Sequence, residues 1–291
     1  MTYVGRFAPT PSGPLHFGSL IAATASFLDA KANQGQWLLR IDDLDTPRVV
    51  PDSIPQILHQ LDAFGFEWDQ TVLYQSQSHA RHIEALEQLI HQQQAFYCDC
   101  TRKQIFARDS DGLYSGYCRD RGLAASDQYA VRFKSPDQNR QLTDLIQGQL
   151  HLNPLKSLGD FVLKRRDGYI GYHLACATDD LAQGVTHVIR GSDLLQSSFA
   201  QTLICQALAN QSLQYGHHPV AVTSQHIKYS KSAQSPAIDA DQAVLQIWQV
   251  LAFLNQSPPL ELQQASLNEI WSWAIRHWHL HNIPAKDMIE I

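Results

Sequence analysis

The sequence predicts an α/β protein built around a parallel β-sheet. Strand and helix signals alternate along residues 1–97, and they return between Phe161 and Tyr215. Strands that alternate with helices require crossover connections, which place helices against a parallel sheet. Hydrophobic residues make up 44% of the 291 residues and charged residues 17%, a globular composition that excludes a disordered chain.

The first elements follow from short apolar runs. Residues 3–7 predict a strand, and a turn-rich stretch follows it. The alanine-rich segment 20–32 predicts a helix, with Gly35 as the residue that stops it. Residues 37–41 predict a second strand. Apolar residues at helical spacing predict two more helices, over 54–64 and 83–90.

The remaining chain divides into three further parts by composition. Periodicity weakens over 98–158, where short strand pieces appear, as at residues 129–133, so we interpret this part as an insertion. Residues 159–238 resume the sheet domain begun in 1–97. The last part, 239–291, is expected to be helical, with a capping box at 266–269 before a helix around Trp271.

Charge and cysteine content limit the class of protein. The net charge is −6, yet residues 98–172 hold 12 Lys and Arg against 9 Asp and Glu. This local excess of positive charge is compatible with binding to a phosphate group and equally with an ordinary solvated surface. Five cysteines at irregular spacing indicate reduced thiols. No apolar run is long enough for a membrane span, and no signal peptide is evident. We expect a cytoplasmic protein with no membrane partner, acting as a monomer.

The strongest motif lies where the first strand meets the first helix. Residues 6–13 read Arg-Phe-Ala-Pro-Thr-Pro-Ser-Gly, and residues 16–19 read His-Phe-Gly-Ser. A helix N-terminus offers unpaired N–H groups to an anion, and Gly18 allows a nucleotide to approach the backbone. His16 offers a hydrogen bond to a phosphate. Taken singly, Gly18 is equally explained as a turn residue and His16 as a surface histidine.

A second motif lies about 210 residues later, where residues 228–232 read Lys-Tyr-Ser-Lys-Ser. Two lysines in a loop neutralise a polyphosphate and stabilise a departing pyrophosphate. In isolation such a motif is also explained as a solvated basic loop.

Two further motifs lie between the first two in the sequence. Residues 40–48 read Arg-Ile-Asp-Asp-Leu-Asp-Thr-Pro-Arg, and residues 188–195 read Val-Ile-Arg-Gly-Ser-Asp-Leu-Leu. The four motifs, in this order, resemble the HIGH, R-[IF]-[ED]-D-[TIL]-D-x-x-R, V-x-R-G-x-D-L and KMSKS signatures of class I aminoacyl-tRNA synthetases of the glutamyl type. The resemblance implies a Rossmann-like catalytic domain with a zinc-binding insertion and a short C-terminal helical region.

Length selects a subgroup within this branch. Only 59 residues follow Ser232, whereas glutamyl-tRNA synthetases continue with a large anticodon-binding region. The chain is therefore similar to the short paralogs, the glutamyl-Q tRNA(Asp) synthetases, which often have serine at the position of Ser19. This resemblance implies a ligase that activates L-glutamate with ATP in the absence of tRNA. It also implies transfer of the glutamate to queuosine in the anticodon of tRNA(Asp).

The resemblance further implies how glutamate is held. Arg6 and Arg190 are the matched cations, because a guanidinium pairs bidentately with a carboxylate. Asp42 would face the ammonium group, at a position where glutamate is commoner, so the charge is kept on a shorter side chain. Tyr172 would donate a hydrogen bond. The other expected glutamate contacts are Ala8 and Thr10, with Ser12 in the same turn. Two alternative interpretations remain: the arginines form structural ion pairs, and the Tyr172 ring packs in the protein interior.

The same resemblance assigns the catalytic and ATP-binding residues. His16 is expected at the ATP phosphates and Lys231 at the departing pyrophosphate, with Lys228 as a third catalytic residue. The expected ATP contacts are Pro9, His16, Gly18, Ser19 and Lys231. Mg²⁺ is expected to accompany ATP, although no motif in the sequence indicates which residues bind it.

The insertion carries a candidate metal site. Cys98, Cys100 and Cys118 supply three thiols, and a structural Zn²⁺ site needs a fourth ligand. No histidine lies between His91 and His151; the resemblance supplies Tyr114 as the fourth ligand. Ordinary buried thiols are the alternative. Cys176 and Cys205 lie in apolar contexts and are predicted to be core residues.

Two alternative functions remain at this stage. A minimal glutamyl-tRNA synthetase would charge the 3′ end of a tRNA. A catalytically silent RNA-binding or regulatory paralog would neither activate nor transfer glutamate, and the intact His16, Arg190 and Lys231 weigh against it.

Overall fold

The first half of the chain folds into a three-stranded parallel sheet with its helices. The computed structural model describes residues 2–45, 48–223 and 236–291. β1 pairs with β2 and β2 pairs with β3, all in parallel. The elements are β1 (Val4–Phe7), α1 (Phe17–Ala32), β2 (Gln36–Ile41), α2 (Ser53–Ala63), β3 (Asp69–Tyr74) and α3 (His79–His91). The two strands and three helices expected here are present, and β3 is an addition.

The helix α1 ends at Ala32, as expected, but begins three residues before the expected segment 20–32. It begins at Phe17 because His16 forms its N-cap. The left-handed residue after the helix is Gln34, with a φ of 54°, and not Gly35. Gly35 is needed for a different reason: a Cβ atom there would lie 2.5 Å from the carbonyl oxygen of Tyr3. The glycine therefore permits the close approach of β1 and the turn.

The middle of the chain builds a small antiparallel sheet and a hairpin. The strand order of the small sheet is β4-β5-β8, and β6 pairs with β7 in the hairpin. The elements are β4 (Ala95–Cys98), α4 (Arg102–Arg108), β5 (Ala130–Phe133), β6 (Arg140–Asp144), β7 (Gly148–Leu152), α5 (Pro154–Leu158) and β8 (Val162–Lys164). The expected strand at 129–133 corresponds to β5. The strand β6 also pairs with β10 at Tyr215 and Asp144, so the hairpin extends a second parallel sheet.

The second half of the chain completes the sheet and adds a helical pair. The strands β9 and β10 are parallel, and the sheet order is β7-β6-β10-β9. The elements are α6 (Tyr172–Ala182), β9 (His187–Gly191), α7 (Leu195–Ala209), β10 (Gln214–His218), β11 (Val220–Val222), α8 (Ala243–Phe253), α9 (Leu267–His277) and β12 (Met288–Glu290). The predicted capping box at Ser266 and Glu269 is present at the start of α9. The short strand β12, which pairs with β11, is not indicated by any sequence pattern.

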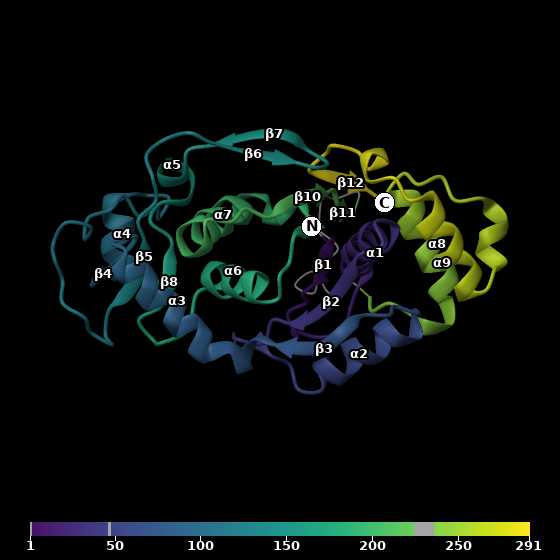
Figure 1. Cartoon of the computed structure of the whole chain (residues 1–291), viewed down its shortest axis with the longest axis horizontal. Coiled ribbons are helices and arrows are strands. Elements are labelled where there is room, and N and C mark those ends of the chain that lie inside the picture. The colour runs from purple at the N-terminus through teal and green to yellow at the C-terminus, as the bar shows by residue number, and fades with distance from the viewer. Residues whose placement is uncertain (1, 46–47, 224–235) are drawn as a thin grey trace.

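The two parallel sheets meet where β1 lies beside β9. The N–H of Thr186 donates to the carbonyl of Val4 at 2.9 Å. Helices cover both faces: α1, α8 and α9 lie on one side, and α6 and α7 lie on the other (Figure 1). Successive residues of β2 confirm the two-sided arrangement, because Trp37 and Leu39 join one hydrophobic core while Leu38 joins the other. This is the layering of a doubly wound α/β fold.

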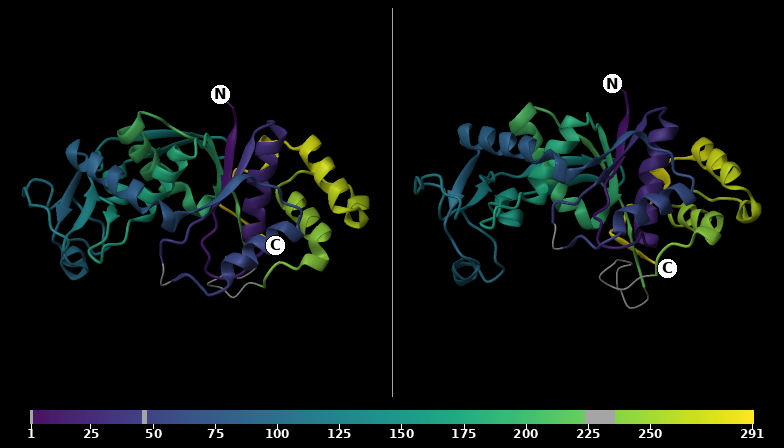
Figure 2. Two further views of the ribbon diagram at one scale, coloured as in Figure 1. Left: turned by 60° about the horizontal axis from the view of Figure 1, so that its bottom comes forward. Right: turned by 90° about the horizontal axis from the view of Figure 1, so that it is seen from below.

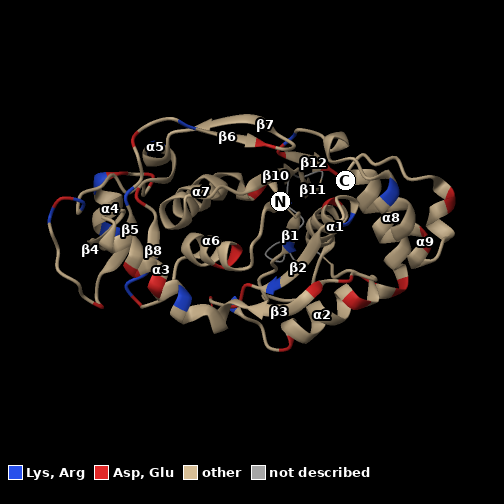
Figure 3. Ribbon diagram, in the orientation of Figure 1, with Lys and Arg blue, Asp and Glu red and all other residues tan. Residues whose placement is uncertain are grey.

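The molecule is elongated along the direction that separates its accessory parts. The small sheet β4-β5-β8 lies at one end, and α8 and α9 lie at the other (Figure 2). Lys, Arg, Asp and Glu all occur on the end with the small sheet (Figure 3). Among the described residues, no helix combines the length and the hydropathy that crossing a membrane requires.

Candidate active site

A cavity of about 310 Å³ opens at the carboxyl ends of β1, β9 and β10. The chain leaves β1 for α1 on one face of the sheet and leaves β9 for α7 on the other. Ligands of open α/β sheets bind at such a switch point. The lining includes every predicted glutamate and ATP contact that the structure describes: Arg6, Ala8, Pro9, Thr10, His16, Gly18, Ser19, Asp42, Tyr172 and Arg190. Lys228 and Lys231 lie outside the described residues.

The N-terminus of α1 forms one wall of the cavity. The Nδ1 atom of His16 accepts a hydrogen bond from the backbone N–H of Ser19 at 3.3 Å. An accepting Nδ1 leaves the proton of a neutral ring on Nε2, which can donate to an anion. The first turn of α1 contains no acidic residue that would compete for its N–H groups. His16 also forms a β-bridge with Ala237. The chain that follows the Lys-Tyr-Ser-Lys-Ser motif therefore returns beside His16.

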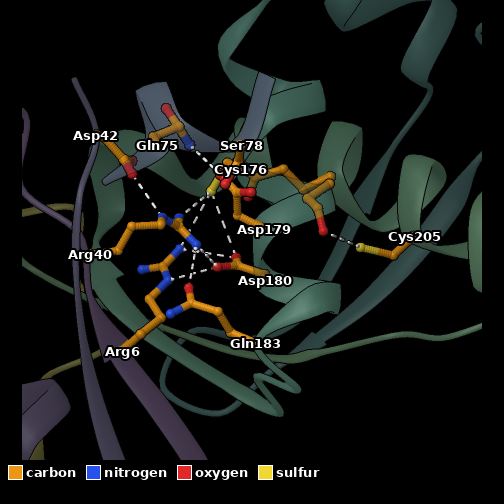
Figure 4. A network of polar contacts seen from close by, with 12 residues as sticks. Arg6, Arg40, Asp42, Gln75, Ser78, Cys176, Asp179, Asp180, Gln183 and Cys205 are labelled. Carbon is orange, nitrogen blue, oxygen red and sulfur yellow. Dashed lines mark hydrogen bonds and ion pairs between the residues drawn. The ribbon is translucent and has the colours of Figure 1, made fainter. Parts of the chain in front are cut away.

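A second wall contains a buried network of alternating charges (Figure 4). Arg6 binds Asp180 through Nε and Nη2, both at 3.3 Å. Arg40 bridges the network, because its Nη1 lies 2.6 Å from Asp180 and its Nε lies 2.8 Å from Asp42. Burial disfavours the charged form of Asp180, but the charges of Arg6 and Arg40 outweigh it and lower its pKa to about 2. Burial dominates at Asp42 and raises its pKa, although Arg40 offsets part of the effect.

Cys176 lies within this network. Its Sγ atom is 3.3 Å from Nη2 of Arg40 and 3.6 Å from Nη2 of Arg6. The residue is buried, as predicted, but its surroundings are charged where an apolar core was expected. Cys205 does lie in an apolar core. The difference arises because Cys176 occupies the face of α6 that meets the buried guanidinium groups.

The third wall is formed by Arg190, whose hydrogen-bond partners in the described part of the chain are uncharged. Its Nη2 donates to Ser198 Oγ at 2.6 Å and to Gln201 Oε1 at 2.9 Å. Its Nε faces His217 Nε2 at 3.3 Å. Its Nη1 lies 3.5 Å from the hydroxyl of Tyr172, on the side of the cavity. Arg190 is 4% exposed, so this cation is nearly buried and reaches the cavity through Nη1.

The turn between β1 and α1 closes the floor of the cavity. The backbone N–H of Asp42 donates to the carbonyl of Pro9 at 3.0 Å, which ties the turn to the end of β2. Tyr172 is 40% exposed and stands over this floor. Thr10, Asp42 and Tyr172 also line a second cavity of about 280 Å³, so the two spaces adjoin.

Motif reasoning did not identify several residues of the site. Gly191, Asp193 and Leu194 line the cavity and lie within the predicted motif at 188–195, so a closer use of that motif would have found them. No motif marks the residues that reach the cavity from the end of β10 and beyond, namely His218, Pro219, Val220 and Ala221. The supporting residues Asp144, Ser198 and His217 are also unmarked, because only the folded sheet brings them behind Arg190.

A cysteine cluster lies away from this cavity, at the end of the molecule with the small sheet. The Sγ atoms of Cys98, Cys100 and Cys118 lie within 4.8 Å of one another. The Sγ atoms of Cys100 and Cys118 are 3.5 Å apart, and the hydroxyl of Tyr114 is 3.8 Å from Cys100 Sγ. Tetrahedral Zn²⁺ with Zn–S bonds of about 2.3 Å places sulfurs at about this separation. The four predicted ligands thus converge, and their donor atoms suit zinc.

Comparison with known proteins identifies the family. Residues 3–254 match the family described as tRNA synthetases class I (E and Q), catalytic domain. A glutamyl-Q tRNA(Asp) synthetase of Pseudomonas aeruginosa (strain LESB58) is 44% identical over 97% of this chain and 96% of its own length. One of Vibrio vulnificus (strain CMCP6) is 41% identical over 100% of this chain and 94% of its own length. The chain belongs to the glutamyl-Q tRNA(Asp) synthetase family.

A solved structure agrees with this assignment. The glutamate-tRNA synthetase from Elizabethkingia anophelis superimposes with a TM-score of 0.83 at 26% identity, over 98% of this chain and 67% of that chain. The predicted family, the class I synthetase fold and the ligase class are therefore confirmed. The assignment of individual residues to glutamate, ATP and metal stays a prediction.

Proposed function

We propose that the cavity activates L-glutamate with ATP and that the chain then transfers the glutamyl group to queuosine in the anticodon of tRNA(Asp). One observation carries the proposal: in a member of this family, a single cavity joins a helix N-terminus to a buried arginine whose Nη1 lies on the side of the cavity. The first feature suits phosphates and the second suits a carboxylate.

Activation is an in-line displacement at phosphorus. The α-carboxylate oxygen of glutamate forms a bond to the α-phosphorus of ATP, the bond to the bridging oxygen breaks, and pyrophosphate leaves with that electron pair. The protein contributes position and charge stabilisation. His16, Pro9, Gly18 and Ser19 would hold ATP at the start of α1. Lys231 would stabilise pyrophosphate, with Lys228 beside it, and Mg²⁺ would neutralise the phosphates.

Glutamate would lie between the two arginine walls. Arg190 would bind a carboxylate through Nη1, and Tyr172 would donate a hydrogen bond. Asp42 would face the ammonium group, since Arg40 contacts only its Oδ1 atom. Arg6 would contribute through Nη1, because its contacts with Asp180 use Nε and Nη2. Ala8 and Thr10 would contact glutamate from the turn.

Transfer requires a hydroxyl group that reaches the carbonyl carbon of the adenylate. The oxygen of that hydroxyl forms the new ester bond, and AMP leaves. The test supplies labelled glutamate, ATP and either queuosine-containing or queuosine-free tRNA(Asp). The terminal adenosine of each tRNA is removed in a parallel sample. We expect label only on queuosine-containing tRNA, whether or not the terminal adenosine is present.

Two outcomes would replace the proposal. Label that requires the terminal adenosine would establish a minimal glutamyl-tRNA synthetase. An absence of both activation and transfer would indicate a silent RNA-binding paralog.

We also propose that Cys98, Cys100, Tyr114 and Cys118 hold one structural Zn²⁺ ion. Arg108 lies 3.2 Å from Cys100 Sγ and Arg121 lies 3.4 Å from Cys118 Sγ, so nearby cations offset the charge of the thiolates. Metal analysis of protein never exposed to chelator should give about one zinc per chain. Less than about half would favour free thiols. Metal-stripped protein, with Mg²⁺ restored, should keep its activation rate because the cluster lies outside the cavity.

A further inference from the structure

Behind Arg190, three buried residues continue from it in a chain of hydrogen bonds. Asp144 Oδ2 lies 2.6 Å from His217 Nδ1, and His217 Nε2 lies 2.9 Å from Ser198 Oγ. Ser198 Oγ in turn accepts from Arg190 Nη2 at 2.6 Å. Asp144, His217 and Ser198 are at most 3% exposed.

The partners determine which nitrogen of His217 carries the proton. Asp144 is an acceptor, so Nδ1 must donate to it. Arg190 can only donate, and its Nε faces His217 Nε2 at 3.3 Å. Ser198 already accepts from Arg190, which leaves its hydroxyl hydrogen for Nε2. His217 is therefore the neutral tautomer with its proton on Nδ1 and two donors directed at Nε2.

Electrostatics agrees with this geometry. Burial lowers the pKa of His217, so the ring stays neutral although Asp144 favours its charged form. Burial alone would raise the pKa of Asp144, but the hydrogen bonds from His217 and from the backbone N–H groups of Gln147 and Ile146 together outweigh burial and lower that pKa. Asp144 therefore carries the charge that fixes the proton on Nδ1.

We infer that Asp144 and His217 are positioning residues that fix the orientation of Arg190 through the tautomer of His217 and so set the affinity and selectivity for glutamate. This inference rests on the proposed activation of glutamate in the cavity. With Nε and Nη2 bound to acceptors behind it, Arg190 presents Nη1 alone to the ligand. A fixed donor face suits a carboxylate, whereas an amide would have to present its oxygen in one orientation.

The inference explains why a residue of the hairpin matters at the cavity. Asp144 ends β6, and its Oδ1 accepts from the backbone N–H groups of Ile146 and Gln147 at 2.9 and 2.8 Å. The same oxygen accepts from the backbone N–H of His217 at 3.1 Å. One carboxylate thus shapes the hairpin turn with one oxygen and orients His217 with the other.

This division of labour makes Asp144→Asn an informative variant. The amide oxygen of asparagine can keep the three backbone hydrogen bonds, so the turn is preserved. Its NH₂ group would face His217 Nδ1 and force the ring proton onto Nε2, where it would oppose the N–H of Arg190. Removing the proton-fixing carboxylate has the same effect on tautomer in a Ser-His-Asp triad.

The test measures KM for glutamate and for ATP in pyrophosphate exchange, together with the rate for glutamate against glutamine. Asp144→Asn should raise the KM for glutamate roughly tenfold to a hundredfold, by analogy with the loss of a carboxylate that orients a metal-binding histidine. The KM for ATP should change less than about twofold, and the preference over glutamine should fall. Equal increases in both KM values would overturn the inference.

A double-mutant cycle separates the tautomer from a structural role. Glutamine at 217 places an amide oxygen near the position of Nε2 and has no tautomer, so Asp144→Asn should add little in a His217→Gln background. If Asp144→Asn has its full effect there, Asp144 acts only through the turn. If Asp144→Asn fails to fold, the KM for glutamate is compared between His217→Gln and His217→Asn instead. The glutamine variant should have the lower KM for glutamate, and the reverse order would overturn the inference.

Two measurements keep this test separate from the proposed function. Nitrogen-15 spectra of the histidine rings report the tautomer without any reaction, and the signal lost in His217→Gln identifies His217. The proton should lie on Nδ1 in the wild type and on Nε2 in Asp144→Asn; an unchanged tautomer contradicts the inference even if pyrophosphate exchange is absent.

Asp179→Asn is the matched control. It alters another buried Asp–His pair, with His82 at 3.0 Å, and should leave the KM for glutamate within about threefold.

Discussion

The two arginines of the cavity are held in opposite ways. Arg6 shares the carboxylate of Asp180 with Arg40, so its charge is compensated inside the protein. Among the described residues, the groups that hydrogen-bond to Arg190 are uncharged. A cation that is neutralised by a protein carboxylate chiefly stabilises the fold. A cation that has only neutral partners can instead pair with the negative charge of a ligand. The comparison therefore assigns the larger part in stability to the wall of Arg6, which would also contact glutamate, and the larger part in selectivity to the wall of Arg190.

The largest expected effect is that of Arg190→Ala on glutamate use. Removing one member of a buried charge pair with a ligand costs about 4 kcal/mol, or roughly a thousandfold in kcat/KM. Pyrophosphate exchange at varied glutamate concentration measures it. Arg190→Lys should recover only part of the loss, since lysine keeps the charge but not the fork. A loss below tenfold for the alanine variant would remove Arg190 from the glutamate site.

Lys231→Ala tests the cation that the Lys-Tyr-Ser-Lys-Ser motif predicts at the departing pyrophosphate. Loss of one charge stabiliser at the departing pyrophosphate should cost about 3 kcal/mol, roughly a hundredfold in the activation rate. The effect should appear in kcat and leave the KM for glutamate nearly unchanged, in contrast to Asp144→Asn. A near-normal activation rate would exclude Lys231 from catalysis.

The wall around Arg6 should respond to acid. The pKa of Asp180 is about 2 in the fold, below the unfolded value of about 3.9, so its stabilisation is fully present above the unfolded pKa. That stabilisation, about 2 kcal/mol, should be lost as the pH falls from about 4 through 2. Chemical denaturation of the wild type and Asp180→Asn measures it. The stability gap between the two proteins should narrow over that range, and a constant gap would contradict the charge-pair account.

The smallest expected effect is that of Tyr172→Phe. Its hydroxyl lies 3.5 Å from Arg190 Nη1, a long contact, and one hydrogen bond to a ligand contributes about 1 kcal/mol. The KM for glutamate should rise roughly fivefold, and the free energy of unfolding should stay nearly constant because the side chain is partly exposed. A change above a hundredfold would mean that Tyr172 takes part directly in the chemistry.

Sequence motifs predicted the residues that face the cavity better than those behind it. Arg6, His16 and Arg190 belong to contiguous motifs at strand ends, where local sequence and function coincide. Asp180 and His217 could not be predicted, because they reach the arginines only through the pairing of β9 with β10 and the packing of α6. Asp144 is more distant still, since it depends on the hairpin β6-β7 joining β10.

The fold shows the same division. Amphipathic helices such as α2 and α3 and the capping box of α9 are encoded by nearby residues, so their positions were predicted. The strand β12 has three residues and exists only because β11 offers it an edge. Elements that depend on a distant partner leave little trace in local periodicity.

Glutamate-dependent exchange of pyrophosphate into ATP, measured without any tRNA, tests the central claim most directly. A cavity that holds ATP at α1 and glutamate at Arg190 needs no RNA to assemble it, so exchange should proceed with tRNA absent and should require glutamate. An absolute requirement for tRNA, or exchange that does not depend on glutamate, would contradict it.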